Sequence, residues 1–200
     1  MSVTDREDPD GLGHLEPIDP PRGRELAYKV GIPVLGVLAG VGGLLVFLAP
    51  ELRSNVFTFL GIYLVPGGID AGPPLGVSLL DLDPLWVVAL VTYFDLWLTL
   101  FWVWNIDHLV RFGVIQRQVE KSRERAHGLW ERFPWLRVAT GPGLAVFITI
   151  PIPTTGSFSG VTIGKLIDLP DPVVYLASVG GTLVRVAALA FGAEGVLWFF

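Results

Sequence analysis

Two hydrophobic stretches of this chain are each interrupted at mid-length by proline and glycine. The first interruption runs from Pro66 to Gly76, and the second runs from Pro151 to Gly156. A helix needs about 20 residues to cross the hydrocarbon layer, and the apolar segments beside these breaks are roughly half that long. Irregular backbone at membrane depth is tolerated only where it is buried in protein or lines a polar cavity. The breaks therefore predict two re-entrant helical hairpins, whose chain turns back inside the membrane.

Composition places the whole chain in the membrane class. Hydrophobic residues make up 52% of its 200 residues and charged residues only 16%. We expect one all-α membrane domain over residues 26–200, preceded by a disordered acidic tail over residues 1–25. The chain has no cysteine and only three scattered histidines, so we expect no metal site and no cofactor. Its arginine-rich basic set and acidic tail resemble the composition of proteins from halophilic archaea.

Long apolar runs and the two interrupted stretches alternate along the chain. Three runs are long enough to span the bilayer, over residues 27–49, 84–106 and 172–197. The re-entrant hairpins are predicted over residues 54–83 and 141–169. Between the second span and the second hairpin, residues 107–139 carry most of the arginines. A short basic loop of this kind stays in the cytoplasm, so we expect a multi-pass plasma membrane protein with this loop inside.

The position of the basic loop also predicts an internal symmetry. With residues 107–139 inside, the first hairpin dips into the membrane from outside and the second dips from inside. A hairpin followed by a span therefore occurs twice, with opposite polarity. That order is the pattern of an inverted-topology repeat, here with an extra N-terminal spanning helix.

Two charges fall near the middle of predicted spans. Asp95 lies in residues 84–106 and Arg185 lies in residues 172–197. A charge at the centre of a spanning helix costs about 2.5 to 3.5 kcal/mol, so each needs a partner or a hydrated cavity. One interpretation is an Asp95–Arg185 pair that only clamps two helices. The other is a transport site, in which Arg185 binds an anionic group and Asp95 carries a coupling proton, with Asp70 as a second carboxylate.

The breaks themselves suit an anionic ligand. A half-helix that begins inside the membrane directs its free amides and partial positive charge at whatever occupies the centre. The predicted substrate-binding residues combine the buried arginine with backbone and hydroxyl groups of the two breaks, namely Arg185, Gly72, Thr154, Thr155, Gly156 and Ser157. For Ser157, simple helix capping is the alternative role.

The residues from Pro142 to Gly164 resemble the signature stretch of the putative small multidrug export proteins, a family of small prokaryotic membrane proteins that usually shows Pro-Leu-Pro-Gly-Thr-Gly-Ala-Trp-Thr-Gly there. Residues 69–76 are similar to the first hairpin of that family, with Asp70 as the nearest acidic residue. The resemblance covers residues 54–195. The family is distantly similar to the DedA superfamily, which implies two facing re-entrant hairpins and the movement of lipid-linked phosphates or lipids.

These observations favour a secondary transporter or flippase for an anionic or amphiphilic substrate. A lipid-linked phosphate is one example of such a substrate. The alternative is a non-transporting scaffold that docks a cytosolic partner through residues 107–139. We do not expect an enzyme, because no nucleophile and base set is recognisable. Membrane lipids are the expected partners and nucleic acids are not. The spacing of Gly36 and Gly40 makes a homodimer a candidate assembly.

Overall fold

The computed structural model of the chain describes residues 23–65, 67–111, 140–149 and 157–197, and throughout these ranges the regular structure is α-helical. The acidic tail, most of the basic loop and the second break, including Thr154, Thr155 and Gly156, lie outside the described residues. The described helices are α1 (Gly23–Phe47), α2 (Pro50–Leu64), α3 (Gly68–Ser78), α4 (Pro84–Arg111), α7 (Thr140–Thr149), α8 (Ser157–Leu166) and α9 (Asp171–Leu197).

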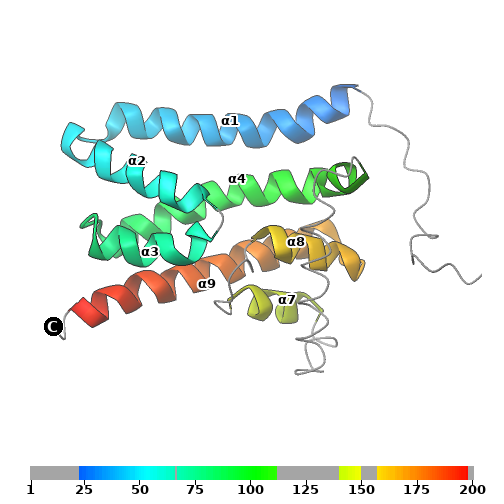
Figure 1. Cartoon of the computed structure of the whole chain (residues 1–200). Coiled ribbons are helices and arrows are strands. Elements are labelled where there is room, and N and C mark those ends of the chain that lie inside the picture. The colour runs from blue at the N-terminus through cyan, green and yellow to red at the C-terminus, as the bar shows by residue number, and fades with distance from the viewer. Residues whose placement is uncertain (1–22, 66, 112–139, 150–156, 198–200) are drawn as a thin grey trace, which may run out of the picture.

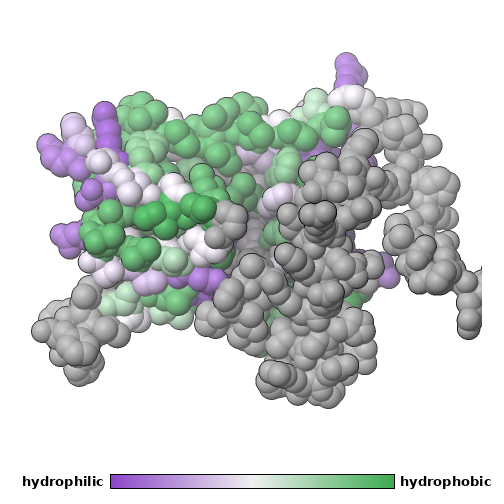
Figure 2. Space-filling view, viewed as in Figure 1, coloured by the Kyte–Doolittle hydropathy of each residue, from purple (hydrophilic) through white to green (hydrophobic). Residues whose placement is uncertain are grey.

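Three of these helices are long and apolar enough to cross a membrane, and they fall where the sequence predicted spans. The apolar segments are Gly23–Phe47, Pro84–Leu109 and Asp171–Ala193. Large apolar side chains such as Leu35, Leu38 and Phe47 stay exposed on α1. Figure 2 shows this apolar surface along α1, with hydrophilic side chains at both ends of it. An exposed apolar surface of this extent is expected where lipid replaces water as the solvent.

The short helices are grouped at opposite ends of the long ones. α4 and α9 pack together most extensively and run in opposite directions (Figure 1). The α2–α3 pair lies beside one end of this two-helix core and the α7–α8 pair lies beside the other end (Figure 1). α3 and α8 each pack on both α4 and α9. Each pair therefore contacts a long helix that belongs to the other half of the sequence.

The first break is much shorter than the sequence predicted. After a break that begins at Pro66, the sequence favoured a short return helix that starts at Gly72–Pro74, but α3 begins at Gly68 and contains Pro73 and Pro74. The turn uses Gly67, whose φ of 87° lies in the left-handed region that favours glycine. The prediction was wrong because proline fixes a helical φ and removes only its own amide, so a short helix tolerates it. The missing amides leave the Ile69 and Asp70 carbonyls without their partners from the next helical turn.

α3 and α8 are each followed by an aspartate in the left-handed conformation. Asp81 and Asp168 have φ values of 51° and 54°, which are uncommon for residues with a side chain. The next residue in each case is a leucine whose amide donates back to a glycine carbonyl, Leu82 to Gly76 at 3.0 Å and Leu169 to Gly164 at 2.9 Å. A left-handed residue followed by such a bond is the usual way to close a helix C-terminus.

The end of α8 is also fixed by charge. Lys165 Nζ lies 2.6 Å from Asp171 Oδ1 on α9 and 3.4 Å from Asp107 Oδ2 on α4. Burial lowers the pKa of Lys165, but the hydrogen bond to Asp171 and the charges of Asp107 and Asp171 outweigh it, so the pKa lies above its usual value. This cluster holds α8 against the two long helices.

Packing of α1 against α4 uses the glycines that the sequence assigned to a dimer. A Cβ added to Gly36 or Gly40 would overlap the rings of Trp97 and Tyr93, respectively. The Tyr93 hydroxyl donates to the Gly36 carbonyl at 2.8 Å. Pro33 cannot bond the Lys29 carbonyl one turn before it, and Asn105 Nδ2 donates to that carbonyl at 3.0 Å instead. Gly36 and Gly40 thus make contacts within the chain. Their spacing no longer supports a homodimer, which remains an expectation.

Alanine substitutions on α1 test this packing. We expect Gly40→Ala to lower stability by about 1 to 3 kcal/mol, because the Tyr93 ring that its methyl would meet is held by the bond to Gly36. Gly43 has open space around its Cβ position, so Gly43→Ala should be neutral or stabilising by up to about 1 kcal/mol. Thermal unfolding in detergent micelles measures both. Equal midpoints for the two variants would contradict the packing of α1 on α4.

Candidate functional site

Arg185 is the largest fully buried side chain in the described part of the chain, with 1% of its surface exposed. It lies in α9 and reaches both short-helix pairs. Its Nη2 forms an ion pair with Asp70 in the first turn of α3, and its Nη1 donates to the Ile148 carbonyl of α7 at 3.4 Å. The carbonyl end of α7 carries partial negative charge, which favours a cation there. One guanidinium group thus joins elements from the two halves of the chain.

Asp95 on α4 is the second buried charge, with 3% of its surface exposed. Its described hydrogen bonds come from hydroxyl groups. Ser157, the first residue of α8, donates to Oδ1 at 2.5 Å, and Thr99 donates to Oδ2 at 3.3 Å. The Ser157 hydroxyl also lies 3.0 Å from that of Thr182 on α9. Tyr63 at the end of α2 and Thr182 interact with the carboxylate as well. Helices from both halves therefore surround Asp95.

The two charged centres are built in the same crossed way. Asp70 on α3 forms an ion pair with Arg185 of α9, and Ser157 on α8 donates a hydrogen bond to Asp95 of α4. Asp70 and Ser157 each precede the left-handed aspartate of their own half, Asp81 or Asp168, by eleven residues. Each half of the chain supplies a polar group near the start of its second short helix, and that group binds the charge on the long helix of the other half.

The structure changes several details of the predicted site. Arg185 and Asp95 do not clamp each other, because Asp70 and Ile148 hold the first, and the hydroxyls of Ser157 and Thr99 hold the second. Ser157 was assigned to substrate binding, with helix capping as the alternative, and its hydroxyl bonds to Asp95 and lies beside Thr182. Gly72, assigned to substrate binding, is buried within α3 and faces Phe59 and Tyr63 of α2. The structure therefore brings Arg185 to Asp70 and Asp95 to Ser157.

Three residues of the Asp95 centre were missed by sequence reasoning. They are Tyr63, Thr99 and Thr182. Thr99 follows Asp95 by four residues, which places the two on one helix face. Thr182 follows Asp168 by fourteen residues, just as Asp95 follows Asp81, so aligning the two halves would have identified it. No comparable signal marks Tyr63, because its position depends on how α2 packs on the core.

Asp70 has one oxygen that the described contacts leave unsatisfied. Oδ1 binds Arg185, whereas Oδ2 is buried without a hydrogen-bond partner among the described residues. The Asp70 side chain as a whole is 25% exposed. A buried carboxylate oxygen without a donor is costly, so this side chain is held by its charge rather than by a complete set of hydrogen bonds.

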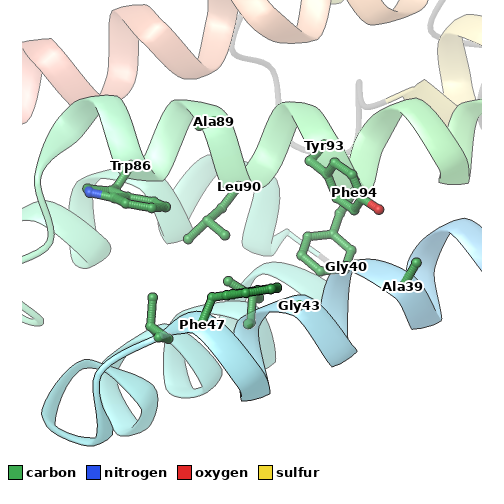
Figure 3. Close-up of a pocket in the computed structure, with 11 residues that line it drawn as sticks. Ala39, Gly40, Gly43, Phe47, Trp86, Ala89, Leu90, Tyr93 and Phe94 are labelled. Carbon is green, nitrogen blue, oxygen red and sulfur yellow. The ribbon is translucent and has the colours of Figure 1, made fainter.

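A separate apolar cavity of about 450 Å³ lies between α1 and α4 (Figure 3). Glycines of α1 and aromatic rings of α4 form much of its wall, and its lining residues are Ala39, Gly40, Gly43, Leu44, Phe47, Leu48, Trp86, Ala89, Leu90, Tyr93 and Phe94. This lining contains no ionisable group other than the Tyr93 hydroxyl, which is bonded to Gly36. The cavity therefore suits an apolar chain and is distinct from the two charged centres.

Metal chemistry has no visible ligand set in the described ranges. No group of three or more histidine, cysteine, aspartate or glutamate side chains is close enough there to hold an ion. The chemistry available to the two centres consists of ion pairing by Arg185 and proton exchange on carboxylates and hydroxyls. Such groups can bind an anion and a proton without making or breaking a covalent bond in the ligand.

Comparison with known protein families gives one match. Residues 67–187, more than half of the chain, match the family described as putative small multi-drug export protein. The matched region begins at the turn before α3 and ends just after Arg185, so it contains both buried charges with Asp70 and Ser157, but neither Tyr63 nor α1. Neither the curated proteins nor the solved structures include a match to this chain.

Proposed function

The chain belongs to the putative small multi-drug export protein family, and on that basis we propose that it is a secondary membrane transporter or flippase for anionic amphiphiles. The observation that carries the proposal is the burial of Arg185 between the two short-helix pairs. A buried arginine near the middle of a spanning helix is expensive, and it is held here by short helices from opposite ends of the core. Guanidinium binds phosphate and carboxylate groups through paired donors, so an anionic headgroup is the natural ligand.

We propose further that Asp95 exchanges a coupling proton. Its described partners are hydroxyl groups, which can donate to a carboxylate and accept from a carboxylic acid. Both protonation states can therefore be accommodated without rebuilding the centre. Because Ser157 belongs to α8 and Tyr63 to α2, a proton on Asp95 changes hydrogen bonds to both short-helix pairs at once.

The same observations support an inverted repeat of two re-entrant pairs in a plasma membrane protein. α2–α3 and α7–α8 lie at opposite ends of the α4–α9 core, and their second helices end with the same left-handed aspartate. In this architecture the Asp81 end faces outside. The Asp168 end then faces the cytoplasm with the basic loop.

Cysteine labelling tests this topology directly, because the natural chain contains no cysteine. We expect Asp81→Cys to react with a membrane-impermeant maleimide on intact cells. Asp168→Cys should react only after the membrane is permeabilised, because the two ends face opposite sides. Both positions are exposed at helix ends, so neither label needs to enter the protein. Labelling of both cysteines from the same side would exclude the inverted arrangement.

Transport itself is tested by reconstitution. The purified chain is inserted into liposomes loaded with a fluorescent acyl phosphate, and efflux is followed with and without a pH gradient. We expect efflux above that of protein-free liposomes, with a dependence on the direction of the gradient. Efflux equal to that of protein-free liposomes under every gradient would count against the proposed function.

A further inference from the structure

Arg185 already carries an anion in this structure. Its ion pair with Asp70 joins the first turn of α3 to the middle of α9. The carboxylate thus occupies one side of the group to which the proposed function assigns the headgroup of the substrate. Two anions cannot share this side of a single buried guanidinium without strong repulsion, so a substrate anion must compete with Asp70.

We propose that Asp70 is an internal counter-anion, that the anionic group of the substrate displaces it from Arg185, and that the displaced carboxylate takes up one proton from water. This inference rests on the proposed function and specifies how its anion and its proton are coupled. The exchange breaks one ion pair and forms another, and the proton adds to a carboxylate oxygen of Asp70. No covalent bond of the substrate changes.

The surroundings of Asp70 explain why displacement brings a proton. The helices packed against α3 are α2, α4 and α9. Their buried ionisable side chains in the described ranges are Tyr63, Asp95 and Arg185, respectively. Of these only Arg185 is a cation, and once it binds the substrate it no longer neutralises Asp70. A partly buried carboxylate left without a cation is costly, and protonation removes the charge.

Oδ2 of Asp70 supports the same conclusion. This oxygen is buried and has no hydrogen-bond partner among the described residues, so the charge of the side chain depends on the contact of Oδ1 with Arg185. A carboxylate with several donors would remain charged after losing one of them. Among the described residues, Asp70 has no donor other than Arg185. Proton uptake and anion binding are therefore linked through one ion pair, and linkage makes each favour the other by the same factor.

A binding experiment with an anion of fixed charge tests the exchange. Decanesulfonate is titrated into the purified chain in lipid nanodiscs by calorimetry, in buffers of different ionisation enthalpy that report proton uptake. We expect the wild-type chain to take up one proton per bound decanesulfonate. Its apparent affinity should rise about tenfold for each unit by which pH falls, in the range where free Asp70 is ionised and displaced Asp70 is protonated.

Asp70→Asn removes the competing charge and the proton acceptor together. We expect this variant to bind decanesulfonate without proton uptake and with an affinity that does not depend on pH. Asp81→Asn is the matched control, because it makes the same change at the exposed end of the same helix, and it should behave as the wild type does. The wild-type proton count stands as a test even if Asp70→Asn does not fold.

The outcomes separate this inference from the proposed function. Binding by the wild-type chain without proton uptake would overturn the exchange and leave Arg185 as an anion site. A pH-dependent affinity that persists in folded Asp70→Asn would overturn it as well. If neither the wild-type chain nor Asp70→Asn binds decanesulfonate, the anion site itself is wrong, and the exchange is overturned with it.

Discussion

Arg185→Gln is expected to lower transport of the acyl phosphate at least tenfold and to destabilise the protein by about 3 to 5 kcal/mol. The transport loss follows because a hydrogen bond to a charged group contributes about 1.5 to 3 kcal/mol, and a tenfold change corresponds to about 1.4 kcal/mol. The stability loss follows because Asp70 loses its cation, and removing one partner of a buried ion pair is strongly destabilising. Proteoliposome efflux and thermal unfolding measure the two effects.

A double variant separates the two consequences. Asp70→Asn combined with Arg185→Gln removes both charges of the pair, so it should recover much of the lost stability. Transport should stay low, because the anion has no guanidinium to bind. Arg24→Gln, an exposed arginine near the start of α1, is the matched control and should leave both quantities unchanged. Recovery of transport in the double variant would show that Arg185 acts only through Asp70.

Asp95→Asn is expected to leave the protein folded and to abolish the dependence of transport on the pH gradient. Asparagine has nearly the same size, and its carbonyl oxygen can accept the hydrogen bond from Ser157. It cannot exchange a proton, so a gradient can no longer drive the cycle through this residue. Efflux from proteoliposomes under opposite pH gradients gives the readout. Rates that still respond to the gradient as in the wild type would remove Asp95 from the coupling mechanism.

Two further variants serve as comparisons for Asp95→Asn. Asp95→Leu should unfold at a lower temperature than Asp95→Asn, because it leaves the hydroxyls of Ser157 and Thr182 without a carboxylate in a buried centre. Asp81→Asn, at an exposed helix end, should leave the gradient response intact. If folded Arg185→Gln and folded Asp95→Asn both transport at wild-type rates, the proposed site is wrong.

Much of the helical layout could be read from the sequence because it depends on local composition. The three long apolar runs became α1, α4 and α9, and the largest boundary difference is at the end of α4, which was predicted at residue 106 and lies at Arg111. Gly160 and Gly164 of α8, whose four-residue spacing places them on one helix face, pack against side chains of α7 and α9. The extent of the first break was misjudged, because Pro73 and Pro74 were taken as the start of a helix that begins at Gly68.

Contacts between distant residues were harder to predict. Arg185 and Asp95 stand out in sequence as charges in apolar runs, and both are buried in the structure. Their partners lie 115 and 62 residues away, at Asp70 and Ser157. Nothing local distinguishes those partners from an ordinary first-turn aspartate or a capping serine. The spacing of Gly36 and Gly40 likewise suits a contact within the chain as well as one between chains.

By itself the sequence determined that this chain enters a membrane, which segments can cross it and where two charges must be sheltered. These properties follow from the transfer of side chains out of water, which acts on each segment separately. Only the tertiary structure decided that Asp70 neutralises Arg185 and that hydroxyls surround Asp95. Those pairings depend on how α3 and α8 dock against the long helices of the opposite halves. Such docking is fixed by packing across the whole molecule, which no single segment encodes.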